Sequence, residues 1–228
     1  MFLPQHRQLG AESPYRTANS PSAALLLGME FFRRAAGQPT TLGVFPGTFN
    51  PVTVAHLALA QAALRLVDEV VFILPRTFPH KTWSGASFDD RVSLLLSALA
   101  SEDRFSIAST THGLFVDIAA ECRLSYSSGI VLSFLCGADA AERIATWDYG
   151  DPAAFTRMME EFDLLVAHRG TDLPVRPPWR PLELPGTYTH VSASEVRSRI
   201  ARGEPWEHLV PVAVRDQVRR IYSPTARP

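Results

Sequence analysis

The sequence predicts a doubly wound α/β domain in which helices cover both faces of a mainly parallel sheet. From Thr41 onward, short apolar runs alternate with helical stretches. Several of these runs are almost entirely apolar, as is typical of strands buried on both faces. Parallel strands joined by helices form right-handed crossovers, which favours the doubly wound arrangement. Ligands bind such sheets beyond the carboxyl ends of the strands, so we expect the functional residues there.

The composition predicts one globular domain that binds neither nucleic acid nor a membrane surface. The chain has 228 residues, 46% of them hydrophobic, and we expect a domain over residues 41–228 preceded by an arm and a helix within residues 1–40. A net charge of -1 provides no basic field for nucleic acid or a membrane surface. No apolar run reaches the ~20 residues of a membrane span. Residues 22–32 lack a signal-peptide pattern, so we expect a cytoplasmic protein. Cys122 and Cys136 lack the spacing of metal or redox sites, and we expect both to be ordinary buried thiols. The sequence is compatible with a monomer or a homo-oligomer.

The predicted elements follow in chain order. Residues 1–20 show no periodicity and predict an extended arm, after which a helix is predicted from Pro21 to about Ala36. The expected strands are residues 41–45, 69–75, 104–110, 129–137, 162–168 and 187–192. The expected helices are residues 54–67, 88–100, 113–123, 140–146, 155–161, 194–202 and 211–222. Five prolines from Pro174 to Pro185 predict a surface loop.

The first motif is LGVFPGTFNPVTVAH, which ends at His56. It leaves a strand through a turn, where Gly47 is expected to supply unusual backbone torsions, and enters an alanine-rich helix with Thr53 as N-cap. His56 then lies near the third helical position. Free N–H groups and the helix dipole attract phosphate at this end, and an imidazole can donate a hydrogen bond to an oxyanion. For this motif alone, a capping Thr53 and a merely packed His56 remain the structural alternative.

A second helix start of the same kind lies in HVSASEVRSRI, where Ser194 and Arg197 share one helix face. A hydroxyl and a guanidinium fork placed there can converge on phosphate oxygens. Ser192 and Glu195 also satisfy the S-x-x-E capping box, so a well-capped helix is the alternative. Two such helix starts, one near each end of the α/β region, together favour a nucleotide-phosphate site.

Both motifs resemble the signatures of one superfamily of nucleotidyltransferases. GTFNPVTVAH resembles its (H/T)-x-G-H signature, with Thr53 in place of the first histidine and Ala55 in place of the glycine. VSASEVR resembles its I-S-x-T-x-x-R motif, with Val191 for isoleucine and Ser194 for threonine. The resemblance implies a Rossmann-like sheet. It also implies a set of ATP-binding residues: Gly47, Thr48, Phe49, Thr53, His56, Gly137, Asp139, Ser192, Ser194 and Arg197.

Three further segments are similar to those of nicotinamide and nicotinate mononucleotide adenylyltransferases. ILPRTFPHK resembles their P-x-x-x-x-P-H-K loop, one residue shorter, with Lys81 facing phosphate. GADAAERIATW resembles their G-x-D … W segment, in which Asp139 accepts from ribose hydroxyls and Trp147 stacks on a base. LLVAHRG places Arg169 after a strand. The structural alternatives are a solvated lysine, an aspartate N-cap and a tryptophan that only packs.

The resemblance implies transfer of an adenylyl group from ATP to a mononucleotide acceptor, with release of pyrophosphate. His56, Lys81 and Arg197 would be catalytic, and Asn50, Lys81, Trp147 and Arg169 would bind the acceptor. Mg²⁺ is expected with ATP, held by phosphate oxygens and water, and no metal site made by the protein is expected. Nicotinamide or nicotinate mononucleotide is the expected acceptor.

One departure leaves other functions open. In place of the S-Y-T-x-D-T-like segment that forms part of the acceptor pocket in those families, this chain has THGLFVDIAAECRLSYSSG, residues 111–129. Transfer to pantetheine phosphate or another phosphate-bearing acceptor is therefore an alternative. A nucleotide sensor without catalysis is another.

Overall fold

The fold is built on one seven-stranded sheet, seen here in a computed structural model that describes residues 28–77, 85–147, 149, 151–168, 177–188 and 190–223. The strand order is β1-β4-β3-β2-β5-β6-β7. The strands are β1 (Glu30–Arg33), β2 (Thr41–Pro46), β3 (Glu69–Pro75), β4 (Phe105–Thr110), β5 (Val131–Gly137), β6 (Asp163–His168) and β7 (Arg180–Glu183). All neighbouring strands are parallel except β1, which pairs antiparallel with β4. The predicted mainly parallel α/β sheet is confirmed.

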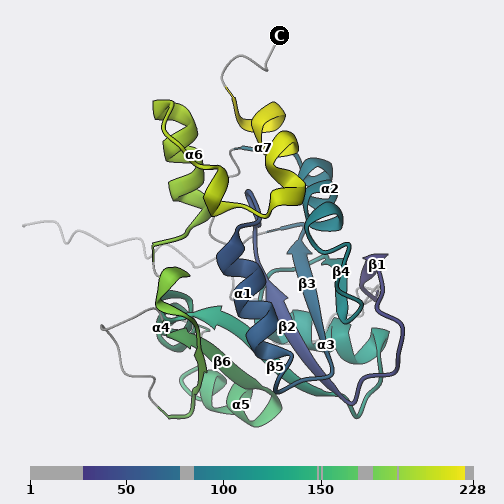
Figure 1. Ribbon diagram of the computed structural model, residues 1–228. Helices are drawn as coiled ribbons and strands as arrows, with labels where there is room; N and C mark the ends of the chain where they lie inside the picture. The colour runs from purple at the N-terminus through teal and green to yellow at the C-terminus, as the bar shows by residue number, and fades with distance from the viewer. Residues whose placement is uncertain are drawn as a thin grey trace, which may run out of the picture.

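Helices cover both faces of this sheet, as predicted (Figure 1). The helices are α1 (Val54–Ala63), α2 (Phe88–Ala98), α3 (Phe115–Ser125), α4 (Ala138–Thr146), α5 (Ala154–Glu161), α6 (Ala193–Arg202) and α7 (Arg215–Tyr222). Short 3-10 turns cover Gly186–Tyr188, Glu207–Leu209 and Val212–Val214. One hydrophobic core joins the sheet to α1, α2, α6 and α7, and a second joins its other face to α3, α4 and α5.

The direction of winding reverses between β2 and β5. The chain passes from β2 outward to β3 and β4, then crosses to β5 and continues outward on the other side to β6 and β7. At such a point the two connections leave in opposite directions and open a crevice at the carboxyl ends of the strands. In Figure 1, α6 and α7 lie beyond this end of β2 and β3.

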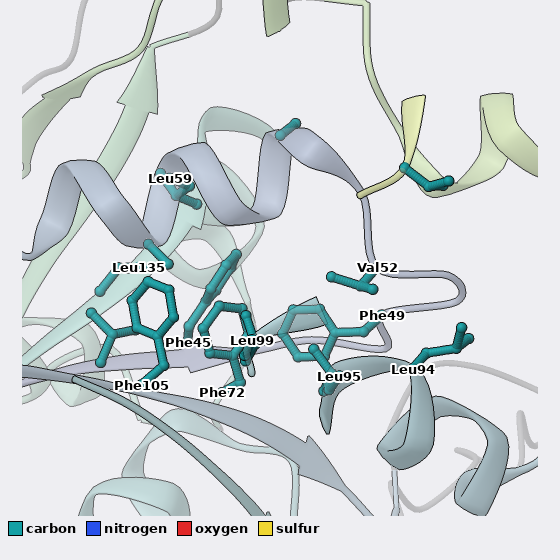
Figure 2. Close-up of a cluster of buried hydrophobic side chains, with 14 of the residues drawn as sticks. Phe45, Phe49, Val52, Leu59, Phe72, Leu94, Leu95, Leu99, Phe105 and Leu135 are labelled. Carbon is teal, nitrogen blue, oxygen red and sulfur yellow. The ribbon is translucent and has the colours of Figure 1, made fainter. Parts of the chain in front are cut away.

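An aromatic cluster supports the turn that follows β2. Phe49 is 1% exposed, and its ring centroid lies 5.4 Å from those of Phe45 and Phe72. Figure 2 shows these rings packed between α1 and the sheet, with Leu59 and Leu95 nearby. The turn therefore rests on a rigid apolar base.

The helix predicted from Pro21 to Ala36 is wrong where the structure describes it, because Glu30–Arg33 forms β1. Phe31 packs toward one core and Phe32 toward the other, as adjacent residues of a strand do. Arg33 also donates to the backbone carbonyl of Glu102 at 2.6 Å. Pairing with β4 at the sheet edge decides this conformation, and local propensity cannot predict such pairing. Residues 1–27 lie outside the described part.

The strand predicted over residues 187–192 is also wrong. Gly186–Tyr188 forms a 3-10 turn, and the last strand is Arg180–Glu183, inside the proline-rich stretch expected to be a loop. β7 lies at the sheet edge, where a residue such as Pro181 needs to donate no hydrogen bond to a further strand. Leu182 anchors the strand because its side chain is buried.

Candidate active site

The start of α1 is held by a reciprocal capping box between Thr53 and His56. The imidazole Nδ1 accepts from the Thr53 backbone N–H at 3.0 Å and lies 2.8 Å from the Thr53 hydroxyl, and this hydroxyl accepts from the His56 backbone N–H. The predicted N-cap and the third-position histidine are confirmed as local structure. Because Nδ1 accepts a hydrogen bond, the neutral ring carries its proton on Nε2. The cap therefore prepares His56 as a donor, while Thr53 is fully buried.

In the turn before α1, Gly47 is needed because a side chain at this position would collide with the Phe49 ring. Gly47 has no positive φ, contrary to the expectation of unusual torsions; a Cβ at this position would lie 2.8 Å from the Phe49 ring. Phe49 itself adopts φ 45°, the left-handed conformation. Its ring packs edge-on against His56, with centroids 5.2 Å apart. Since the whole residue is 1% exposed, Phe49 supports the turn from inside the core, and neither its ring nor its backbone is open to solvent.

The second helix start lies beside the first. Ser192 caps α6 by accepting from the Glu195 backbone N–H at 3.1 Å, whereas the Glu195 carboxylate pairs with Arg199, so only half of the predicted capping box forms. Arg197 reaches across to the first motif. Its guanidinium donates to the carbonyl oxygen of Asn50 and, at 3.2 Å, to the Ser194 hydroxyl. The two motifs predicted to share one site are therefore in contact.

Two residues that the sequence analysis did not select hold the turn in place. Arg91, buried on α2, donates to the carbonyl oxygen of Thr48 at 3.0 Å. Tyr222, at the end of α7, donates to the side-chain oxygen of Asn50, which also accepts from the Ala86 backbone N–H at 3.4 Å. Burial raises the pKa of the Tyr222 hydroxyl, so it stays protonated and acts as a donor. The available signal for Arg91 was its spacing on α2, three residues after Phe88 and four before Leu95, which puts it on the helix face that packs against the core.

A cavity of about 260 Å³ lies on the other side of the same turn, over the carboxyl ends of β2, β3 and β5. Its walls come from the turn, from the α3 start and from one face of α4. The lining residues are Pro46, Gly47, Thr48, Pro75, Gly113, Leu114, Phe115, Cys136, Ala140, Arg143, Ile144, Trp147 and Tyr149. Burial raises the pKa of the Cys136 thiol to about 12, so it behaves as a neutral apolar group.

The cavity includes one predicted acceptor residue and part of the segment that departs from the related families. Trp147 lines it from the end of α4, whereas Asn50 is not among its lining residues. Gly113, Leu114 and Phe115 belong to the altered stretch of residues 111–129, which therefore still forms a cavity wall. Tyr149 also lines the cavity and donates to the Ile144 carbonyl oxygen at 3.1 Å.

The start of α4 adjoins this cavity. The helix begins at Ala138 with Gly137 as N-cap, so the alternative of an N-cap at Asp139 is wrong. Open space surrounds the position where a Gly137 side chain would lie. Asp139 is exposed in the first turn, between the lining residues Cys136 and Ala140. A ligand group can thus approach the backbone at this strand end.

Lys81 and Arg169, both predicted to bind phosphate or acceptor, lie outside the described residues. Over the described ranges, no three His, Cys, Asp or Glu side chains gather as metal ligands would. The same part of the chain contains no helix of the length and apolarity required to cross a membrane.

Comparison with known proteins places this site within a family. A model of the cytidylyltransferase-like family matches residues 44–199, from β2 to α6, including both helix starts and every lining residue of the cavity. The chain belongs to the cytidylyltransferase-like family. It is therefore an enzyme, a nucleotidyltransferase. The resemblance inferred from the two motifs is confirmed.

Relatives of this family member cover most of its length. A protein of Solibacter usitatus, named a probable nicotinate-nucleotide adenylyltransferase, is 31% identical over 189 residues, which are 76% of this chain and 94% of the relative. A protein of Shouchella clausii with the same name is 29% identical over 194 residues, 79% of this chain and 96% of the relative.

A solved structure shares the fold of this cytidylyltransferase-like chain. The nicotinic acid mononucleotide adenylyltransferase of Plasmodium falciparum, complexed with NaAD, superposes with a TM-score of 0.63 at 15% identity. The match covers 78% of this chain and 94% of the other. The Rossmann-like α/β fold is thus shared with a distant protein.

Proposed function

We propose that this nucleotidyltransferase joins the adenylyl group of ATP to the phosphate of nicotinate mononucleotide, releasing pyrophosphate and forming a dinucleotide. The contact of Arg197 with Asn50 carries the proposal. It joins two helix N-termini at one turn, and the other side of this turn opens into the cavity at Gly47 and Thr48. Phosphates at the turn and an acceptor ring in the cavity would use both sides. The names of the relatives favour nicotinate over nicotinamide as the acceptor.

The reaction needs positioning and charge neutralisation more than acid–base chemistry. An oxygen of the acceptor phosphate attacks the α-phosphorus of ATP, and the bond from this phosphorus to the bridging oxygen of pyrophosphate breaks. The acceptor phosphate is ionised near neutral pH, so no residue has to remove a proton. The Nε2–H of His56 and the guanidinium of Arg197, together with the N–H groups that begin α1 and α6, would stabilise the negative charge. Lys81 is proposed to add a further positive charge.

The remaining predicted residues would divide between the two substrates. Asp139 and the backbone at Gly137 are proposed to bind the ATP ribose, and Trp147 the acceptor ring. Mg²⁺ would screen the triphosphate charge. We propose that phosphate oxygens and water hold this ion, as is usual for Mg²⁺ bound together with a nucleotide. Both cysteines are buried free thiols, which supports a reducing, cytoplasmic setting.

An acceptor panel tests the proposal directly. The purified protein would be given ATP and Mg²⁺ with nicotinate mononucleotide, nicotinamide mononucleotide or pantetheine phosphate, and pyrophosphate and dinucleotide would be measured. A second series would replace ATP with CTP. We expect the highest kcat/KM with ATP and nicotinate mononucleotide. Preferred use of pantetheine phosphate, or of CTP, would overturn the proposal, as would tight ATP binding without transfer to any acceptor.

A further inference from the structure

One face of α4 forms a wall of the cavity. Ala140, Arg143, Ile144 and Trp147 all line the cavity, and their spacing of three, four and seven residues puts them on one side of a helix. Arg143 is the one charged side chain among the described lining residues. The cavity therefore combines an indole, apolar walls and a single cation.

Arg143 differs from other arginines on the same side of the sheet. Arg123 of α3 donates to Glu161, and Arg157 of α5 pairs with Asp151. Within the part of the chain that the structure describes, Arg143 makes no hydrogen bond or ion pair, and its side chain is exposed. A cation in the last turn of a helix interacts favourably with the helix dipole, but a cation at any position in that turn would do so. Its place on the cavity face needs a further reason.

We propose that Arg143 selects the acid form of the acceptor by pairing with the carboxylate on the pyridine ring, an inference that rests on the proposed function. The acceptor phosphate has to lie near Gly47 and Thr48, where the adenylyl group is transferred. The pyridine ring, at the other end of the acceptor, would then lie inside the cavity, next to Trp147. Arg143, one turn of α4 before Trp147, is within reach of a substituent on this ring.

Charge explains why this arrangement discriminates between acid and amide. The ring nitrogen of a pyridine mononucleotide bears a positive charge, which the face of an aromatic side chain such as Trp147 attracts. A neutral carboxamide leaves this positive ring beside a second positive charge. A carboxylate instead accepts the guanidinium fork in a bidentate, charge-assisted pair. The apolar walls at Leu114, Phe115 and Ile144 offer the carboxylate no other charged partner, so Arg143 alone among the described lining residues would pair with it there.

The test compares kcat/KM for nicotinate and nicotinamide mononucleotides in the wild type and in Arg143→Gln. We expect Arg143→Gln to lower kcat/KM for the acid about 10–100-fold, mainly by raising KM, and to leave the amide unchanged or improved. Arg143→Lys keeps the charge without the fork, so its acid preference should lie between the two. The matched control is Arg157→Gln on α5, an exposed arginine outside the cavity, which should keep the wild-type ratio.

The outcomes separate this inference from the proposed function. If the wild type uses nicotinate mononucleotide but Arg143→Gln retains its acid-to-amide ratio within twofold, or loses both activities equally, the role of Arg143 is overturned and the function stands. If the wild type transfers to neither pyridine mononucleotide, the function fails and the inference fails with it. Titration of each acceptor by calorimetry without ATP provides a second readout, in which only acid binding should weaken.

Discussion

Arg197 donates a hydrogen bond to the carbonyl oxygen of Asn50, a residue 147 positions earlier in the chain. This contact fastens the start of α6 to the turn before α1, so that two helix N-termini and one guanidinium converge on the same region. Each helix end alone would attract an anion weakly. Their combination is suited to a triphosphate.

Two replacements of Arg197 should show how much of its contribution to activity comes from its positive charge and how much from the shape of the guanidinium group. We expect Arg197→Ala to lower kcat/KM for ATP about 100-fold or more, because the donor proposed to neutralise phosphate charge is lost. Arg197→Lys should recover only part of this loss, since an ammonium group cannot span the Asn50 carbonyl and the Ser194 hydroxyl as the fork does. Pyrophosphate release measures both. Arg202→Gln, on the same helix but paired with Glu204, is the control and should have wild-type kinetics.

Two variants of His56 should lose activity to a similar extent but differ in their free energy of unfolding. His56→Ala and His56→Gln both remove the imidazole donor, so each should lower kcat by about 100-fold or more. His56→Ala also removes the acceptor for the Thr53 backbone N–H and should cost about 1 kcal/mol of unfolding free energy, whereas glutamine at the third helical position can complete the capping box. Urea unfolding and steady-state kinetics distinguish these effects. Wild-type turnover in either variant would exclude His56 from the mechanism.

Tyr222→Phe should destabilise the turn before α1, although Tyr222 lies far from this turn in the sequence. The hydroxyl of Tyr222 donates to the buried side-chain oxygen of Asn50, and its removal takes away a hydrogen bond closer than the one from the Ala86 backbone N–H at 3.4 Å. We expect a loss of about 1–2 kcal/mol in unfolding free energy and a higher KM for ATP. Tyr188→Phe is a suitable comparison because, across the described residues, the Tyr188 hydroxyl makes no hydrogen bond. Equal stability of the two variants would show that the Asn50 contact contributes nothing.

Asp68 should contribute a pH-dependent part of the stability. Its carboxylate accepts from the backbone N–H groups of Thr41 and Thr40 and from the Thr40 hydroxyl, all at 2.9 Å, which lowers the pKa of Asp68 to about 2. A carboxyl pKa that is lower in the folded state stabilises the protein above the unfolded pKa of about 3.9, and the contribution disappears as the pH falls through the folded pKa. Because Asp68 is exposed, solvent screening limits the effect to about 1 kcal/mol.

Urea unfolding of Asp68→Asn at several pH values measures this contribution. The variant should be less stable than the wild type at pH 7, and the difference should shrink between about pH 5 and pH 2. Asp103→Asn is the comparison variant, because the Asp103 side chain makes no hydrogen bond in the described ranges and its replacement breaks none. A stability difference that stays constant with pH would contradict this role of Asp68.

The alternation of strands and helices, the caps at Thr53 and Ser192, and the buried state of both cysteines could all be read from the chain alone. These features depend on side-chain periodicity and on hydrogen bonds between residues three or four positions apart, and a sequence displays such relations directly. The same local signals identified the two helix starts as candidates for one site.

The features that the sequence analysis missed depend on contacts between distant segments. Glu30–Arg33 becomes a strand because the edge of β4 is open to it, and Arg180–Glu183 does so because it lies beside β6. Arg91 and Tyr222 acquire their roles only when α2 and α7 pack over the turn at Thr48 and Asn50. Such partners are chosen by packing and by the satisfaction of buried polar groups, which no short window of sequence encodes.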